Sequence, residues 1–311
     1  MPQAEGVPTA TVVEPTFRDA ERQAAFERDG VFVTPVLEPG EAAALRQAIV
    51  DILPTSPWDF IDLLRNNPPT LRKQVGALVR EALEPKVAAW FVDHDFWAAS
   101  ILAKPPGPGG IIHLHTDWTF VDERRYRTGL VWVALDDMTL RNGAIVVAPG
   151  TNRLDPGFRG QGIHYPYSDP AVRQAIDDRS VLLDVPAGQA VVWEHRLLHG
   201  SNENTTDDLR LAVGLAFRPR GAQLLHYRLM PDGQAHRYRV DPEFLTHYDA
   251  FTEVEELTGP HLAEDGVHPM PTWAPTPDDL RGLGPVHPIH GAAAAVAPPR
   301  HRRFRRRSRR G

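Results

Sequence analysis

The feature that most constrains the fold is a series of seven short apolar runs between residues 96 and 218. Each run has the length of a β-strand, is rich in Val, Ile or Trp, and is bounded by turn-forming residues such as Gly, Pro and Asn. No helical pattern regularly separates the runs, so we expect an antiparallel sandwich or barrel and not a parallel α/β sheet. The runs are FWAASILAK, IIHLHTDW, TGLVWVALDD, GAIVVAPG, SVLLDV, QAVVWEH and LRLAVGLAFR.

The residues before the first run have a different periodicity. Apolar side chains recur at helical spacing near 18–28, over 38–53 and over 70–83, which predicts three helices, the last of them capped by Thr70. After residue 221 the pattern weakens, and we expect only a short helix over 242–251. The chain is therefore predicted to be mainly helical at first and mainly β in its middle.

The composition limits the chemistry of any site. The chain has 311 residues, 14 histidines and no cysteine, so thiolate chemistry is excluded and a metal would need His, Asp or Glu ligands. Eight arginines in the last twelve residues carry positive charge, and subtracting them from the net charge of −6 leaves −14 for the rest. This acidic body argues against nucleic-acid binding. Because it lacks a long apolar run and a recognisable signal peptide, we expect a cytoplasmic protein without membrane contact.

One apolar run carries an unusual row of polar side chains. In IIHLHTDW, His113, His115 and Asp117 alternate with other residues, and on a regular strand all three point to the same face. Such a row is costly to bury unless it binds something. Taken alone, a structural hydrogen-bonded pair of His115 and Asp117 is the more common arrangement, so the pair needs support from elsewhere in the chain.

That support lies in a second polar block, which begins 84 residues after His115 and contains His199, Ser201 and Arg210. Two histidines and one carboxylate can form a facial triad, which leaves three positions of an octahedral Fe(II) open for a 2-oxo acid and O₂. The planar guanidinium of Arg210 suits the far carboxylate of such an acid. Small residues follow Arg210 on its own face of the predicted strand, and bulky residues occupy the other face, so the arginine face has room for a ligand.

In residues and in order, these blocks resemble the phytanoyl-CoA dioxygenase family of Fe(II)/2-oxoglutarate-dependent oxygenases. The resemblance covers about residues 26–218 and is carried by FERDGVFVTPVL, HTDWTFVDE, VWVALDDMTLRNGAIVVAPGT and HGSNENTTDDLR. It implies a mainly β fold with flanking helices, namely a double-stranded β-helix (a cupin-like jelly roll) with a helical N-terminal region.

The resemblance and the composition together predict a single dioxygenase domain over residues 17–284. Low-complexity composition predicts flexible or disordered ends on both sides of it. The expected parts are a flexible segment 1–16, a helical part 17–95, a jelly-roll core 96–220, a C-terminal extension 221–284 and a disordered basic tail 285–311.

The resemblance also implies a role for each matching site residue. His115, Asp117 and His199 would be the ligands of Fe(II). The residues implied to bind the cosubstrate 2-oxoglutarate are Arg210 at its distal carboxylate, Ser201 beside it, Trp132 along the pocket, and Lys104 as a further positive charge.

Three other positions leave alternatives open. Asn152 stands where the family often has histidine after Pro-Gly-Ser/Thr, which puts a secondary contact, such as one to the substrate, in doubt. His113 could replace a ligand, although we expect it beside the site. His195 and His199 have the spacing of a helical zinc pair, but the residues before them are strand-like.

The implied activity uses Fe(II), 2-oxoglutarate and O₂ to hydroxylate an unactivated C–H bond of a small molecule, and the arginine-rich composition favours secondary-metabolite tailoring. Desaturation, epimerisation or ring formation at the same site are alternatives, whereas Asp117 argues against a halogenase. A non-catalytic metal-binding jelly roll is a further alternative, although it would not need Arg210. Arginines of the 124–127 segment are either an anion site for the substrate or a solvated charge run.

Overall fold

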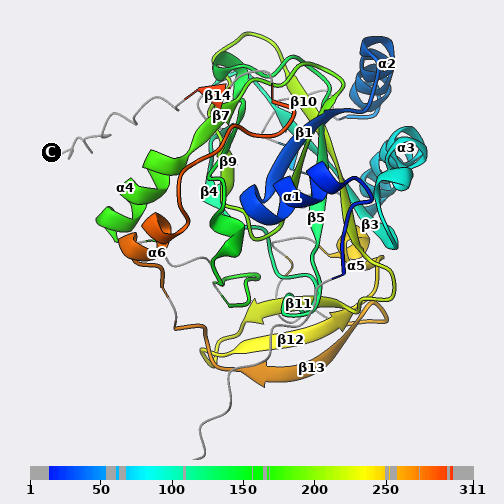
Figure 1. The fold of residues 1–311 in the computed structure, drawn as a ribbon. Helices are drawn as coiled ribbons and strands as arrows, with labels where there is room; N and C mark the ends of the chain where they lie inside the picture. The colour runs from blue at the N-terminus through cyan, green and yellow to red at the C-terminus, as the bar shows by residue number, and fades with distance from the viewer. Residues whose placement is uncertain are drawn as a thin grey trace, which may run out of the picture.

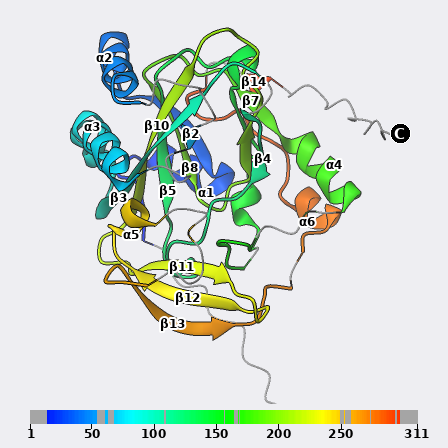
Figure 2. The ribbon, with the colours of Figure 1, turned by 180° about the vertical axis from the view of Figure 1, so that it is seen from behind.

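The computed structural model describes residues 14–53, 61–62, 68–107, 110–155, 157–163, 167, 169–248, 252, 258–272, 274–292 and 295–296. Every strand pairing among them is antiparallel, in three sheets (Figure 1, and from behind in Figure 2). The strands are β1 (Val31–Pro35), β2 (Ile61–Asp62), β3 (His94–Lys104), β4 (Ile112–His115), β5 (Gly129–Ala134), β6 (Ile145–Val147), β7 (Val181–Leu183), β8 (Gln189–Glu194), β9 (His199–Ser201), β10 (Arg210–Pro219), β11 (Leu224–Leu229), β12 (Ala235–Val240), β13 (Leu262–His268) and β14 (Ala295–Val296). The helices are α1 (Ala20–Asp29), α2 (Pro39–Val50), α3 (Pro69–Val87), α4 (Pro170–Arg179), α5 (Phe244–His247) and α6 (Pro277–Gly282), with short 3-10 turns at Ala88–Trp90, Leu140–Asn142 and Thr151–Arg153.

Two of the three sheets together form a jelly roll. Their strand orders are β1-β8-β5-β10-β3-β2 and β14-β7-β6-β9-β4. From β3 to β10, the first, third, sixth and eighth strands lie in one sheet and the other four lie in the facing sheet. This alternation is the topology of an eight-stranded double-sheet jelly roll. The predicted fold class is therefore confirmed.

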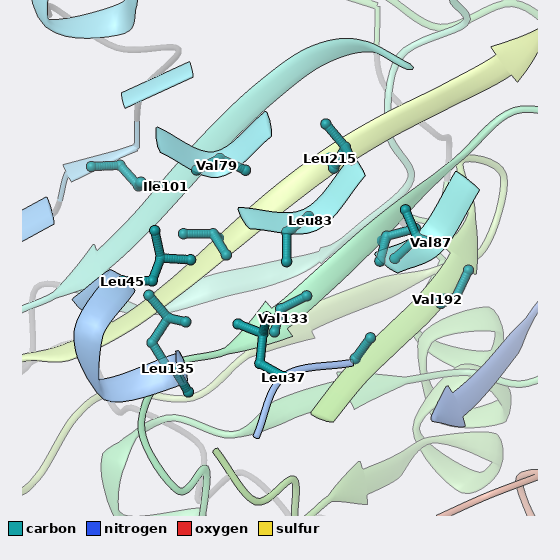
Figure 3. Close-up of a cluster of buried hydrophobic side chains, with 14 of the residues drawn as sticks. Leu37, Leu45, Val79, Leu83, Val87, Ile101, Val133, Leu135, Val192 and Leu215 are labelled. Atoms are coloured by element: carbon teal, nitrogen blue, oxygen red, sulfur yellow. The ribbon is translucent and has the colours of Figure 1, made fainter. Parts of the chain in front are cut away.

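Three N-terminal helices cover the outer face of the larger sheet, as the periodicity of this region predicts. Val79, Leu83 and Val87 of α3 pack against the sheet, as Figure 3 shows. Each such fully buried side chain contributes roughly 1.5–3 kcal/mol. The predicted N-cap was wrong: α3 begins at Pro69 after an extended Pro68, so Thr70 lies inside the helix.

Strand β10 separates two parts of the core. Leu211 and Phe217 belong to the cluster beneath the helices, whereas Ala212 packs between the two sheets and Ala216 borders an internal cavity. The alternation of bulky and small residues along this strand is confirmed. It places Arg210 on the inner face, with small side chains beside it.

A third sheet closes one end of the sandwich and was not predicted. Strands β11, β12 and β13 form it, and α5 packs beside it (Figure 1). Trp97 and Ala216 of the jelly roll contact the buried Tyr238 and Phe244 of this unit. The helix expected over 242–251 is only the four-residue α5. Within this unit, α5 and the residues just before it border the cavity described below.

Part of the segment predicted as the disordered tail packs against the domain. Within residues 285–292, Ile289 is buried and the carbonyl of His290 accepts a hydrogen bond from the N–H of Val33 at 2.8 Å. These contacts favour a disordered tail that begins after residue 285. Most of the predicted flexible segment 1–16 and the whole arginine run lie outside the described residues, so both stay predictions. In the part of the chain that the structure describes, no helix has the length and apolar composition of a membrane span.

Candidate metal and cosubstrate site

Three side chains from distant parts of the sequence meet inside the jelly roll. His115 ends β4, Asp117 follows two residues later, and His199 begins β9, the strand that pairs with β4. One potential ligand atom from each lies within 4.8 Å of the other two. Nε2 of His199 is 3.8 Å from Oδ1 of Asp117, and the two imidazole centroids are 4.4 Å apart. The structure thus brings together the three residues expected to bind metal.

Backbone carbonyls fix the orientation of both imidazoles. Nδ1 of His115 donates to the carbonyl of His113 at 2.9 Å, and Nδ1 of His199 donates to the carbonyl of Leu197 at 3.0 Å. Since a carbonyl can only accept, Nδ1 carries a proton, and in the neutral ring Nε2 then keeps its lone pair. Burial also lowers the pKa of His199 to about 4, despite the nearby carboxylate. Imidazoles held in this orientation present Nε2 to a metal.

The carboxylate of Asp117 is held by neighbours that leave one oxygen free. Nε1 of Trp193 donates to Oδ2 at 2.9 Å, so Oδ1 faces the histidines. The backbone of Asp117 is fixed from two sides: its N–H donates to the carbonyl of His195 at 2.9 Å, and its own carbonyl accepts from Nε of Arg159 at 3.0 Å. Burial opposes ionisation, but the neighbouring histidines and the Trp193 bond outweigh it and lower the pKa of Asp117. The side chain is therefore an anionic ligand.

The register of β4 corrects the expectation for His113. Ile112 pairs with Ser201 and His115 pairs with His199, so β4 has one residue more than β9 between these pairs. Such a bulge reverses the alternation of faces. Ile112 and His115 consequently both border the cavity, whereas His113 is exposed. The prediction that His113 shares a face with the other two polar residues was wrong, and it contributes only its carbonyl.

Arg210 occupies the same cavity as the triad and is only 3% exposed. Its Nη2 donates to the carbonyl of Gly143 at 2.7 Å and its Nε to the carbonyl of Asn142 at 3.4 Å. Its Nη1 has no hydrogen-bond partner among the described residues. Burial lowers the pKa of Arg210 to about 10, which leaves it charged at neutral pH. A buried cation with an unused donor is costly unless an anion binds it, so this environment fits the carboxylate of 2-oxoglutarate.

The other three residues expected around the cosubstrate lie close to Arg210. Ser201 and Trp132 border the cavity, and the guanidinium carbon of Arg210 lies 5.8 Å from the centre of the Trp132 ring. Lys104 is fully buried and does not border the cavity. It donates to Oγ of Ser201 at 2.7 Å and to the carbonyl of Asn202. Burial, reinforced by the charge of Arg210, lowers the pKa of Lys104 to about 6.

Other positions singled out in the sequence do not fit the roles considered for them, and of these only His195 borders the cavity. Asn152 is buried and donates to Oε2 of Glu194 at 3.0 Å and to carbonyls at the end of α1, so it joins structural elements. Arg124 and Arg125 contact groups of their own loop, and Arg127 also lies 3.8 Å from Oε1 of Glu194. His195 follows a strand and bonds Oγ1 of Thr128, which rules out the helical zinc pair.

Two parts of the site were not predicted. Trp193 bonds Asp117 and its ring lies 4.6 Å from that of His199, a contact that strand alternation alone does not reveal. The helix α3 borders the cavity with Lys73, Gly76 and neighbouring residues, although its sequence resembles that of any amphipathic helix.

The fold and this site define a class: jelly-roll proteins with a two-histidine, one-carboxylate centre beside a buried arginine. A family model described as "Phytanoyl-CoA dioxygenase (PhyH)" matches residues 40–212, which is more than half of the chain. This chain therefore belongs to the phytanoyl-CoA dioxygenase family.

Individual relatives match more narrowly. A curated "Phytanoyl-CoA dioxygenase" of Arabidopsis thaliana is 33% identical over 117 residues, which cover 36% of this chain and 40% of the relative's length. Among solved structures, the "non-heme alpha ketoglutarate dependent carbocyclase SnoK from nogalamycin biosynthesis" is 20% identical at a TM-score of 0.49, covering 66% of this chain and 86% of that one. EctD from S. alaskensis in its apoform is 21% identical at a TM-score of 0.46, covering 72% and 85%.

Proposed function

We propose that this protein is an Fe(II)- and 2-oxoglutarate-dependent dioxygenase that hydroxylates an unactivated C–H bond of a small molecule. One observation carries the proposal: a triad of two histidines and a carboxylate shares a cavity of about 600 Å³ with a buried arginine whose Nη1 is unpaired among the described residues. Membership of the family supports the same pair of cofactor and cosubstrate. A structural metal site would not need such an arginine.

In this proposal, His115, Asp117 and His199 hold Fe(II), which when bound supplies the activation of O₂ for C–H oxidation. Arg210 pairs with the distal carboxylate of 2-oxoglutarate through its free donor.

The remaining residues around Arg210 have supporting roles. Ser201 adds a hydroxyl to the cosubstrate site, and Lys104 orients that hydroxyl by donating a hydrogen bond to its oxygen. Trp132 packs along the cosubstrate, and apolar side chains of the wall, among them Ile145 and Leu130, exclude water from the reacting atoms. Desaturation, epimerisation and ring formation use the same residues and differ in the fate of the substrate radical. The arginine-rich composition supports a substrate from secondary metabolism.

The test is succinate formation from 2-oxoglutarate in air by the Fe(II)-loaded protein. We expect slow formation without added substrate, dependent on both Fe(II) and O₂, and faster formation with a substrate. Asp117→Ala should reduce succinate to the level of a protein-free control. Asp122→Ala is the matched control, because it removes a carboxylate of the same segment that pairs with Arg124 outside the cavity. A wild-type protein that binds Fe(II) but forms no succinate with any substrate class would support the non-catalytic alternative.

A further inference from the structure

The cavity has a second end, away from the triad, where α3 and α5 form its wall. One face of α3 borders the cavity with Lys73, Gly76, Ala77 and Arg80, whose spacing places them on one side of the helix. A different face of α3 packs against the large sheet. Helix α3 therefore has two buried or cavity-lining faces. Packing against the sheet explains the residues of one face but not those of the face that borders the cavity.

Gly76 is the least expected residue on the cavity face. It lies in the interior of a 19-residue helix with ordinary helical backbone geometry, where alanine would be more favourable. A Cβ built on Gly76 would have no atom within 4 Å among the described residues. The packing of the chain thus does not require glycine here. Glycine at this position leaves room for a ligand to approach the helix backbone closely.

The residues around this end are apolar and aromatic. Trp97 and Phe120 border the cavity with ring centroids 4.7 Å apart, and Leu245 of α5 belongs to the same cluster. Arg72 of α3 binds the carbonyl of Leu245 at 3.3 Å, which ties α5 to α3. Trp97 is 4% exposed, and its Nε1 has no acceptor in the described part of the chain. This wall suits an apolar body with a hydrogen-bond acceptor.

Lys73 supplies a positive charge at this end. Lys73 borders the cavity and is exposed, and it makes no hydrogen bond or ion pair with any residue that the structure describes. Arg80 pairs with Glu84. Glu243 is the carboxylate that borders this end. Lys73 is thus the cation available to a ligand.

We propose that the substrate has an apolar body that lies against α3 at Gly76 and an acidic group that pairs with Lys73. Its identity as a substrate rests on the proposed function, but its binding does not require turnover. Gly76 is then a specificity-determining residue, because any side chain at this position occupies space that the substrate needs.

A pair of fluorescent probes tests this directly: 8-anilino-1-naphthalenesulfonate, which is anionic, and N-phenyl-1-naphthylamine, its neutral counterpart. Both are titrated into the protein loaded with Zn(II) and 2-oxoglutarate, which cannot turn over. We expect tighter binding of the anionic probe. Lys73→Gln should weaken binding of the anionic probe about 3- to 5-fold, the range of one exposed ion pair, and leave binding of the neutral probe unchanged.

Gly76→Leu should weaken binding of both probes about tenfold, since the leucine side chain fills the space that they occupy. Gly40→Leu is the matched control, because Gly40 lies in α2, outside the cavity, and also has open space at its Cβ among the described residues. Gly76→Ala guards against misfolding: it should raise Tm by about 1–3 °C through helix propensity and still weaken both probes.

Three results would overturn the proposal: no binding of either probe, equal binding of both with no effect of Lys73→Gln, or unchanged binding in both Gly76 variants. Binding of 2-oxoglutarate, measured separately by calorimetry, reports on the proposed function. If the protein did not bind 2-oxoglutarate but probe binding still depended on Lys73 and Gly76, the dioxygenase would be refuted and the ligand site retained. If 2-oxoglutarate bound but probe binding did not depend on these residues, the ligand site would be refuted and the dioxygenase retained.

Discussion

The two ends of the cavity are built in different ways. At the metal end, Nδ1 of His115, Nδ1 of His199 and Oδ2 of Asp117 each have a partner within the chain, so one arrangement is specified before any ligand binds. At the α3 end, Lys73 has no described partner and Gly76 faces open space. The first end is preorganised for one chemistry. At the second end, groups of the chain are left without partners within the described residues, and a ligand would supply the missing contacts. Substitutions at the metal end should therefore affect every turnover, and those at the α3 end should affect which molecules bind.

The largest effect should come from removing a metal ligand. His115→Ala should lower Zn(II) or Fe(II) affinity by more than about 100-fold, beyond the 10- to 100-fold typical of residues that only support a ligand. His113→Ala is the matched control on the same strand, since its exposed imidazole is removed and its carbonyl remains. Calorimetric titration with metal measures both. Equal losses in the two variants would show that the register of β4 is wrong.

Arg210→Met should come next, with an effect confined to the cosubstrate. Charge-assisted hydrogen bonds of roughly 1.5–3 kcal/mol correspond to about a 10- to 150-fold weaker binding of 2-oxoglutarate. Metal affinity should stay within about twofold of wild type, because the guanidinium is not a ligand. Arg124→Met, at the exposed loop, should change neither quantity. If 2-oxoglutarate bound equally well to the Arg210 variant, the cosubstrate would have to lie elsewhere.

Trp193→Phe probes how far preorganisation matters. The ring is retained, but the N–H that holds Oδ2 of Asp117 is lost. We expect about a tenfold loss of metal affinity, at the lower end of supporting interactions, with an unchanged affinity for the neutral naphthylamine probe at the α3 end. A simultaneous loss of probe binding would mean that the two ends are not independent.

An effect outside ligand binding concerns stability and pH. The pKa of Lys104 is about 6 in the folded protein and near 10.5 in the unfolded chain, so between these values only the unfolded state binds the proton. Lys104 therefore destabilises the fold increasingly as the pH falls from about 10 to about 6, and the penalty is constant below that. Lys104→Met should gain Tm relative to wild type across this window. Parallel Tm curves of the variant and the wild type from pH 6 to 10 would contradict the assignment.

Local patterns were sufficient for some parts of the structure. The alternation of small and bulky residues from Arg210 to Phe217 identified both faces of β10, because each face packs against a uniform environment. The triad could also be predicted from local sequence, because the His-x-Asp run and the distal His are recognisable from the residue types and their order alone. The bulge in β4 could not, since it exists only in the pairing with β9, and that pairing is a long-range contact.

Other parts depend on tertiary packing that no local pattern records. Strand β13 contains the adjacent acidic residues Glu264 and Asp265, which point to opposite faces, so it lacks the alternation that predicts a strand. Trp193 reads as an ordinary core residue until it is seen beside Asp117. Gly76 is a poor helix residue in an otherwise regular amphipathic pattern, and its meaning appears only once α3 is placed at the cavity.

The central claim is that one preorganised end of the cavity binds Fe(II) and 2-oxoglutarate together. Anaerobic addition of 2-oxoglutarate to the Fe(II)-loaded protein tests it most directly. We predict a weak visible metal-to-ligand charge-transfer band that saturates with 2-oxoglutarate, is absent in His115→Ala, and requires higher 2-oxoglutarate concentrations in Arg210→Met. Wild-type protein with bound Fe(II) that developed no such band at any 2-oxoglutarate concentration would contradict the claim.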